Sequence, residues 1–351
     1  MARRPACIRH WSEIEREAEA VHPATGEPRA LAADLGGATG LSRIGVRHER
    51  LMPGRRSSPP HAERDEEELV FILEGTPDLW QDGRLYRLAP GVAVGWPDRT
   101  GIAHCLINNS GAPVRYLTVG EASRYASKVH FPRDGEVAAW FARQGMLWTD
   151  PPKRRLGPHG GRPDALRDAP SPKGARGRGL PPNAIDWRAL DVQTGNTYPG
   201  DSEVLADYSH LSSHLGLGRI GGGIDTLQPG RRTSWPHAER DEEEFVFVLE
   251  GAPRAWLDGR LYPLRPGDFV GWPSGTGTAH TILNDGPEPA ILVTFGEASR
   301  RRSRIWYPLH REYALSLCER SWTPPRPPRL APHNATPMAH RICPRRTRPQ
   351  P

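Results

Sequence analysis

A histidine followed by a run of carboxylates occurs twice in this chain. Residues 60–68 read Pro-His-Ala-Glu-Arg-Asp-Glu-Glu-Glu, and residues 236–244 repeat the same nine residues in the same order. Successive side chains of a β-strand alternate between its two faces, so His61 and Glu63 can point in the same direction. An apolar stretch follows each copy. Imidazole and carboxylate groups gathered beside such a strand are what a metal site in a β-barrel needs.

The repetition extends over whole domains. Residues 41–75 and 217–251 are identical at 24 of 35 positions without a gap. The same offset of 176 residues relates Trp11 to Trp187 and Pro132 to Pro308. We therefore expect a first domain at residues 1–170, a Pro/Gly/Arg-rich linker at 171–182, a second domain at 183–320 and a Pro/Arg-rich tail at 321–351.

The local pattern within each copy is that of β-structure. Residues 68–73, 92–96 and 114–119 are apolar runs rich in residues that favour strands. Asp-Gly pairs at residues 82–83 and 258–259 lie between short apolar runs, which is a hairpin signal. Many short strands separated by turns indicate a sandwich or barrel. Helices are expected at residues 12–20 and 136–143.

The spacing of these residues resembles the two motifs of the cupin superfamily. The first motif matches Gly54, His61, Glu63, Glu68 and Gly75, and the second matches Gly91, Pro97, Gly101, His104 and Asn108. In the second half the matching residues are Gly230, His237, Glu239, Glu244, Gly251, Gly267, Pro273, Gly277, His280 and Asn284. The chain is thus similar to a bicupin from a large bacterial group of cupin-domain proteins. The resemblance implies an all-β fold of two tandem jelly-roll barrels with short flanking helices and disordered basic tails.

The same resemblance implies a divalent transition metal in each barrel, with Fe, Mn and Zn as the candidates. The implied ligands are His61, Glu63, Glu68 and His104 in the first half, and His237, Glu239, Glu244 and His280 in the second. Glu63 and Glu239 stand where the family usually has a second histidine. Two alternatives are open for them: they either bind the metal or turn away to pair with an arginine. No catalytic residue beyond the ligands is identified.

Other recurring residues are expected to have structural roles. We expect a solvated acidic rim from Glu66, Glu67, Glu242 and Glu243, core packing from Trp96, Trp272 and Cys105, turn capping from Asn108 and Asn284, and contacts of an arm with the barrel from His159 and His333.

Charge and composition narrow the class of protein. The net charge is +6, but residues 151–180 carry eight Lys/Arg and two Asp, and residues 321–351 carry six Arg and no acid. The remaining body is acidic, which argues against a nucleic-acid groove. No apolar run approaches the roughly 18 residues of a membrane span. Scattered cysteines and the absence of a secretory signal pattern predict a cytoplasmic protein.

Two functions are compatible with these features. The first is a metal-dependent enzyme of the dioxygenase, decarboxylase or isomerase type that acts on a small organic acid, phenol or sugar derivative. The alternative is a non-catalytic module that binds a small ligand in the barrel, because one fold hosts many functions. In both cases the expected partner is a small molecule, and a homodimer is compatible with the sequence.

Overall fold

The computed structural model describes residues 4–16, 20–122, 127–167, 170–298 and 303–337. The protein is mostly β, as predicted, and divides into two compact units. The unit that we call the first barrel contains residues 9–190 and 210–221. The second barrel contains, within the described chain, residues 4–8, 191–209 and 222–337.

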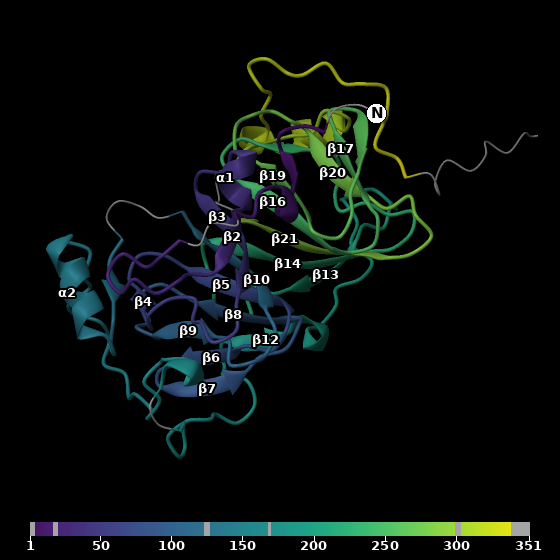
Figure 1. Ribbon diagram of the computed structural model, residues 1–351. Helices are drawn as coiled ribbons and strands as arrows, with labels where there is room; N and C mark the ends of the chain where they lie inside the picture. Colours follow the sequence, from purple (N-terminus) through teal and green to yellow (C-terminus); the bar gives the residue numbers. More distant parts are fainter. Residues whose placement is uncertain (1–3, 17–19, 123–126, 168–169, 299–302, 338–351) are drawn as a thin grey trace, which may run out of the picture. The chain divides into compact units, whose positions relative to one another are not determined.

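The first barrel is built from a six-stranded sheet, a three-stranded sheet and a two-stranded ribbon (Figure 1). The larger sheet has the order β12 (Ala184–Asp186), β8 (Val92–Trp96), β5 (Glu68–Glu74), β10 (Val114–Glu121), β3 (Ile44–Leu51) and β2 (Leu31–Asp34). The smaller sheet has the order β7 (Arg84–Arg87), β6 (Asp78–Gln81) and β9 (His104–Ile107). The ribbon pairs β11 (Val129–His130) with β4 (Ala62–Glu63).

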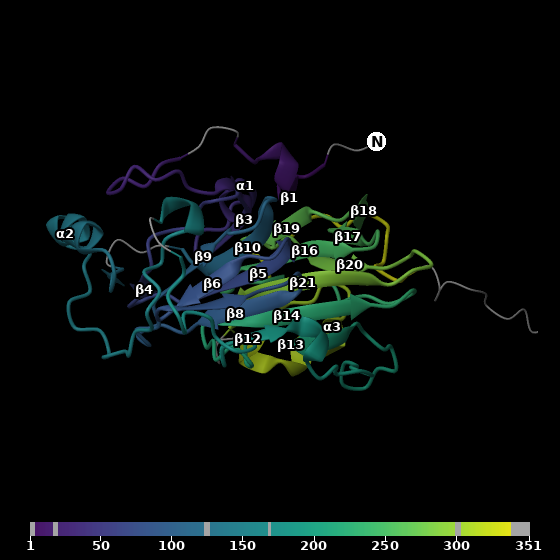
Figure 2. The ribbon, with the colours of Figure 1, turned by 60° about the horizontal axis from the view of Figure 1, so that its bottom comes forward.

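The second barrel repeats this plan (Figure 2). Its larger sheet has the order β1 (Ile8–His10), β19 (Asp268–Trp272), β16 (Glu244–Glu250), β21 (Ala290–Glu297), β14 (Ile220–Leu227) and β13 (Asp207–His210). Its smaller sheet has the order β18 (Arg260–Pro263), β17 (Arg254–Leu257) and β20 (His280–Leu283). Its ribbon pairs β15 (Ala238–Glu239) with β22 (Ile305–Trp306).

The apolar core of each barrel lies between its two larger sheets. In the first barrel Val70 and Val94 of the six-stranded sheet pack with Leu79 and Leu106 of the three-stranded sheet, and all four are at least 96% buried. The equivalent cluster of the second barrel includes Val246 and Ile282. The inward face of each strand is therefore fixed by alternation, and polar residues on that face point into the barrel.

The predicted strands and hairpins are confirmed. The apolar runs at 68–73, 92–96 and 114–119 form β5, β8 and β10. Asp82 and Gly83 connect β6 to β7 with φ angles of 46° and 81°. Positive φ at both central residues is the mark of a tight hairpin turn that matches strand twist, and glycine adopts it without strain.

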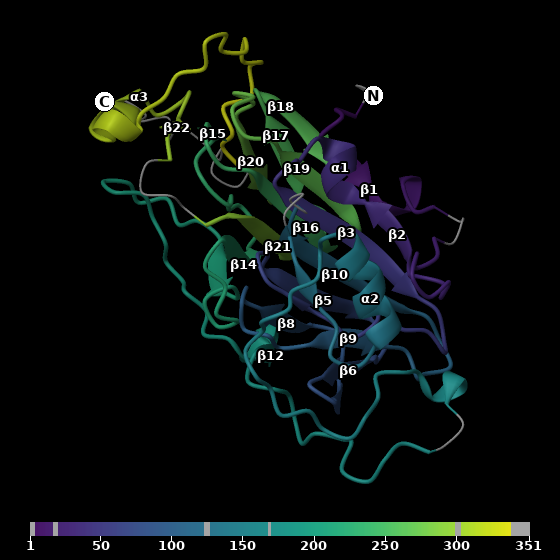
Figure 3. The ribbon, with the colours of Figure 1, turned by 90° about the vertical axis from the view of Figure 1, so that its left-hand side faces the viewer.

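Short helices flank the barrels. The predicted helix at 136–143 is α2 (Gly135–Arg143), whose first turn is capped by the Asp134 side chain. Residues 12–20 were expected to be helical, but Trp11–Glu13 form one 3-10 turn and residues 17–19 lie outside the described chain. The other helices are α1 (Leu35–Thr39) and α3 (Arg311–Ser316), and α3 packs beside β22 (Figure 3). No described helix has the length and apolarity that crossing a bilayer requires.

The edge strands do not follow the order of the repeats. Strand β1 precedes the first barrel in sequence but lies beside β19 of the second, where Gly271 N donates to Cys7 O at 3.0 Å. Strand β12 follows the linker region but pairs antiparallel with β8 of the first barrel. Within that region, residues 175–177 bond to Leu85 of β7. The C-terminal tail is expected to be disordered, and its residues 338–351 lie outside the described chain.

Candidate metal centres

Two histidines from distant segments are paired by the backbone in each barrel. His61 N donates to His104 O at 3.1 Å, and His104 N donates to His61 O at 2.8 Å. The same two-way pairing joins His237 and His280, at 3.2 and 2.8 Å. A directly opposed pair places side chains about 5 Å apart on one face, and the ring centroids lie 5.0 Å apart in the first barrel and 4.8 Å apart in the second.

Each of these imidazoles is oriented by its own backbone. Nδ1 of His61 lies 3.0 Å from Pro59 O and Nδ1 of His104 lies 3.1 Å from Ile102 O. In the second barrel the corresponding carbonyls belong to Trp235, at 2.8 Å, and Thr278, at 3.0 Å. A carbonyl oxygen only accepts hydrogen bonds, so Nδ1 carries the hydrogen in all four rings. Nε2 is the nitrogen left to bind a ligand.

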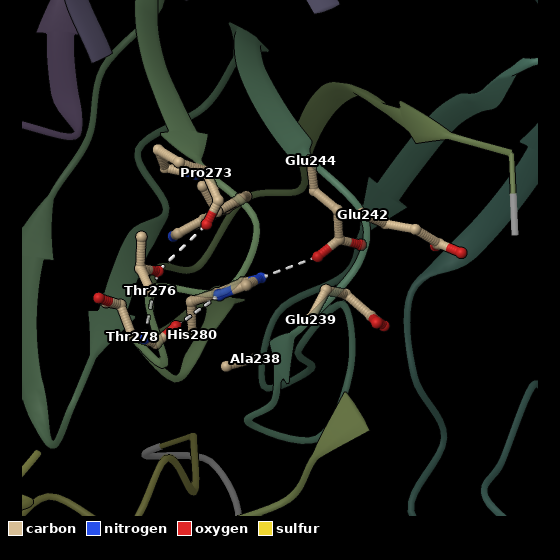
Figure 4. A pocket seen from close by; sticks show the side chains of 9 residues that line it. Ala238, Glu239, Glu242, Glu244, Pro273, Thr276, Thr278 and His280 are labelled. Carbon is tan, nitrogen blue, oxygen red and sulfur yellow. Dashed lines mark hydrogen bonds and ion pairs between the residues drawn. The ribbon is translucent and has the colours of Figure 1, made fainter. Parts of the chain in front are cut away.

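A glutamate from the start of a neighbouring strand completes each group. Glu68 Oε2 lies 3.2 Å from His104 Nε2, and Glu244 Oε2 lies 3.2 Å from His280 Nε2 and 3.5 Å from His237 Nε2. Figure 4 shows the Glu244 carboxylate directed at the His280 ring. In each barrel the two imidazole nitrogens and one carboxylate oxygen all lie within 4.8 Å of one another.

The chemistry of these three donors fits a cation. With the hydrogen on Nδ1, Nε2 of a neutral imidazole presents a lone pair toward a carboxylate oxygen, which repels it. A proton or a metal ion between the two groups removes this repulsion. Two imidazoles and one carboxylate are a donor set suited to Fe, Mn or Zn, and hydrogen-bonded Nδ1 atoms are typical of metal-binding histidines.

A tryptophan covers one histidine of each pair. Trp96 stacks on His104 with ring centroids 3.6 Å apart, and Trp272 stacks on His280 at 4.0 Å. Both tryptophans also belong to the apolar cores, as predicted. The stacked indole fixes the imidazole plane and keeps water from that face of the ring, which adds to the orientation provided at Nδ1.

Comparison with known proteins identifies the fold. The family model described as "Cupin domain" matches residues 47–120 and 223–296, one match in each barrel. The chain is a bicupin. A structure of the oxalate decarboxylase of Lactobacillus farciminis, in a formate complex, is similar at 16% identity with a TM-score of 0.51, over 88% of this chain and 90% of that one. No curated protein matches the sequence.

A second solved structure is also similar. It is the salicylate 1,2-dioxygenase of Pseudoaminobacter salicylatoxidans, as a mutant in complex with gentisate. Its identity is 18% and its TM-score 0.54, over 83% of this chain and 81% of that one. At these identities the similarity establishes the fold alone. The chemistry of this bicupin has to be argued from its own residues.

The two sites of the bicupin differ in charge. Burial, and then the neighbouring His104, lower the pKa of His61 to about 4. Burial opposes protonation of His237 as well, but the Glu244 carboxylate outweighs it and raises the pKa of His237 to about 9. In the metal-free protein the first site therefore holds a neutral His61, whereas the second holds an imidazolium paired with Glu244.

The glutamates at the second position of the His-x-Glu pattern lie outside the three-residue groups. Glu63 Oε1 lies 3.7 Å from His61 Nε2, and Ser127 Oγ donates to Glu63 at 3.4 Å. Glu239 accepts from Ser303 Oγ at 3.2 Å. Burial and the adjacent ligand-type glutamate raise the pKa of Glu239 to about 8. The alternative for these glutamates is an ion pair with an arginine. Within the described residues neither of them forms such a pair.

The expected acidic rim is wrong for three of its four residues. Glu67, Glu242 and Glu243 are all at least 93% buried. The Glu67 carboxylate accepts backbone hydrogen bonds from residues 218–220 at 2.8, 2.8 and 3.0 Å. Glu67 thus anchors that segment to the first barrel. Its partners are backbone amides more than 150 residues away, and no side-chain pattern in the sequence signals them.

The remaining structural expectations are confirmed. Asn108 caps a turn by donating to Leu51 O and Ala112 O at 2.8 Å, and Asn284 does the same in the second barrel. Cys105 lies in an apolar cluster on the face opposite His104. The arms at His159 and His333 contact their barrels, because Trp80 and Trp256 donate to the carbonyls of these histidines at 2.9 and 2.8 Å.

A shallow hollow adjoins the second site and encloses no space large enough for a water molecule. Its lining includes Glu239, Glu242, Glu244, Trp272 and His280. Typical ligand sites in proteins enclose roughly 300–1,000 Å³, so this hollow is not a formed substrate pocket. Figure 4 shows the Glu242 carboxylate turned away from His280.

Proposed function

We propose that this bicupin is a metal-dependent enzyme that binds a divalent transition metal through His61, Glu68 and His104 in the first barrel and through His237, Glu244 and His280 in the second. The observation that carries the proposal is the convergence of three donor atoms within 4.8 Å in each barrel. Fe, Mn and Zn suit such nitrogen and oxygen donors. Glu63 and Glu239 remain further candidate ligands.

The proposed substrate is a small organic acid, phenol or sugar derivative, because oxygen atoms of such a molecule can bind a metal that is held by three protein donors. When bound, the metal supplies a Lewis acid that polarises an oxygen of the substrate. The chain itself fixes the imidazoles through Nδ1 hydrogen bonds and shields one of them with a stacked tryptophan. Decarboxylase, dioxygenase and isomerase chemistry are all compatible with this arrangement.

The test is the metal content of protein purified without a chelating tag and reconstituted with Mn²⁺, Fe²⁺ or Zn²⁺. We expect two ions per chain in the wild type, one in His104→Ala, one in His280→Ala and none in the double variant. His210→Ala, at an exposed position, is the matched control and should keep two ions. A wild-type chain that stays metal-free after reconstitution contradicts the proposal.

The alternative of a non-catalytic binding module is separated by one further measurement. If the double variant His104→Ala/His280→Ala is still stabilised against heat by small organic acids as strongly as the wild type, binding does not use the metal. Loss of that stabilisation together with the metal supports the enzyme.

A further inference from the structure

The inward face of β3 in the first barrel carries charged residues beside the candidate metal centre. Alternation places Gly45, Arg47, Glu49 and Leu51 on one face of this strand. Leu51 belongs to the barrel core, so that face points inward. Tyr116 of β10, also in the core, donates from Oη to Glu49 Oε2 at 2.5 Å. The inward face of β3 is therefore apolar at Leu51 and polar at Glu49 and Arg47.

Arg47 lies diagonally across β10 from the ligand-type glutamate. In the sheet Arg47 pairs with Thr118 of β10, and Glu68 pairs with Gly120 of the same strand. Gly120 in turn pairs with Gly45. Neither glycine has a side chain, and a Cβ built on Gly45 would meet nothing closer than Gly120 O at 3.8 Å. Neither glycine therefore places a side chain between Arg47 and Glu68.

Two exposed arginines of the first barrel form no ion pair within the described residues. The side chains of Arg47 and Arg29 are exposed and form no hydrogen bond or salt bridge in the chain that the structure describes. They are close enough to interact, since burial and the Arg47 charge lower the pKa of Arg29. Both also act on Glu49, whose carboxyl is occupied by Tyr116. Asp34 lies opposite Arg47 in the register of β2 and β3 but forms no ion pair with it, so the two guanidinium groups keep donors available for a bound anion.

The second barrel lacks this arrangement at the corresponding positions. Arg47 corresponds to Gly223 and Arg29 to Leu205. A Cβ at Gly223 would collide with the backbone of Ser209, and Tyr208 lies directly above it. Asp225, at the position of Glu49, accepts a hydrogen bond from Thr294 at 2.7 Å. An arginine side chain cannot be accommodated at Gly223 without moving β13.

We propose that Arg47, assisted by Arg29, binds the carboxylate of a small organic acid at the mouth of the first barrel, beside His61, Glu68 and His104. The first barrel is then the one that recognises an anionic substrate, and the second is not. The identification of this anion as the substrate rests on the proposed metal-dependent function. Arg47 would hold the carboxylate by paired charge-assisted hydrogen bonds, for which guanidinium is suited.

The experiment measures binding of carboxylates and of their neutral amides to the full chain loaded with Mn²⁺. Acetate, succinate and benzoate are compared with acetamide, succinamide and benzamide by titration calorimetry and by the shift of the unfolding temperature. The variants are Arg47→Gln, Arg47→Gly, which installs the residue of the second barrel, and Arg29→Gln. Arg84→Gln, an exposed strand arginine of the same barrel, is the control. Metal content is measured for every variant.

We expect Arg47→Gln to bind carboxylates roughly 10- to 100-fold more weakly, the loss typical of a charge-assisted hydrogen bond. Arg29→Gln should cause a smaller loss, Arg84→Gln none, and binding of the amides and the metal content should not change. The inference is overturned if Arg47→Gln binds carboxylates as tightly as the wild type. It is also overturned if His280→Ala loses carboxylate binding while Arg47→Gln keeps it. A metal-free wild type contradicts the proposed function instead, and the same titrations on metal-free protein then test the arginines alone.

Discussion

The two sites should differ in how metal binding depends on pH. A metal ion competes with protons for the histidine nitrogens. In the second site the pKa of His237 is raised to about 9, so at pH 7 this imidazole holds a proton that the metal must displace. In the first site the pKa of His61 is lowered to about 4, so at pH 7 its nitrogen is already free. Metal binding should therefore release a proton mainly from the second site.

The size of the effect follows from these values. A pKa near 9 makes the protonated form of His237 roughly a hundredfold more abundant than the neutral form at pH 7, because each unit is a factor of ten. The apparent metal affinity of the second site should fall about tenfold for each pH unit between 8 and 6. Glu239, with a pKa raised to about 8, releases protons in the same direction when a cation binds nearby. The first site should change less over this range, because its neutral His61 releases no proton, although burial and the Glu68 charge also raise the pKa of Glu63.

The assay uses the single-site variants. His104→Ala leaves the second site and His280→Ala leaves the first, and Mn²⁺ is titrated into each by calorimetry in buffers of different ionisation enthalpy at pH 7. We expect about one more proton released per ion in His104→Ala than in His280→Ala, because Glu63 and Glu239 can each release protons at their own site but only His237 starts as an imidazolium. Equal proton release from the two variants, or a larger release from the first site, would refute the assignment of these charge states.

Three further predictions concern the surroundings of the sites. Trp272→Phe should weaken metal binding at the second site roughly tenfold, measured by competition with a chelating dye, because the stacking that orients His280 is reduced. Unchanged affinity would show that the hydrogen bond at Nδ1 is enough to orient the His280 ring. Glu67→Gln should lower the free energy of unfolding, measured in urea, by about 2–4 kcal/mol, because it weakens three backbone hydrogen bonds to a buried carboxylate. A loss below about 0.5 kcal/mol would contradict this anchoring role. Gly83→Ala should destabilise the folded protein by about 1–3 kcal/mol more than Gly174→Ala, because both glycines have positive φ but only Gly83 faces another backbone segment where Cβ would lie. Equal losses of stability in thermal denaturation would count against that contact.

The fold was predictable because its signals are local and occur twice. The turn at Asp82 and Gly83 follows from two adjacent residues that tolerate positive φ. The motif spacing likewise placed His61, Glu68 and His104 in one barrel, and the structure brings their donor atoms together. Alternation along a strand needs no knowledge of distant segments.

Features that depend on distant partners could not be predicted in this way. Glu67 looks like part of a solvated acidic run until the backbone of residues 218–220 is placed beside it. The direction of Glu63 is equally undetermined by the sequence, because alternation assigns its face but not the reach of its side chain. The sequence gives no sign of the role proposed for Arg47, because that role depends on the pairing of Arg47 with Thr118 and on the two glycines beside it.

The exchanged edge strands bear on how this protein can be made and divided. A fragment that stops at residue 170 would lack β12, leaving the edge of β8 unpaired, and would lack the segment at 218–220 that Glu67 holds. During synthesis the first barrel cannot be finished until the ribosome has passed Gly221, well into the second repeat. The boundaries of the repeats in the sequence therefore differ from the boundaries of the folded units. Neither half is expected to be an autonomous folding unit if the chain is cut between the repeats.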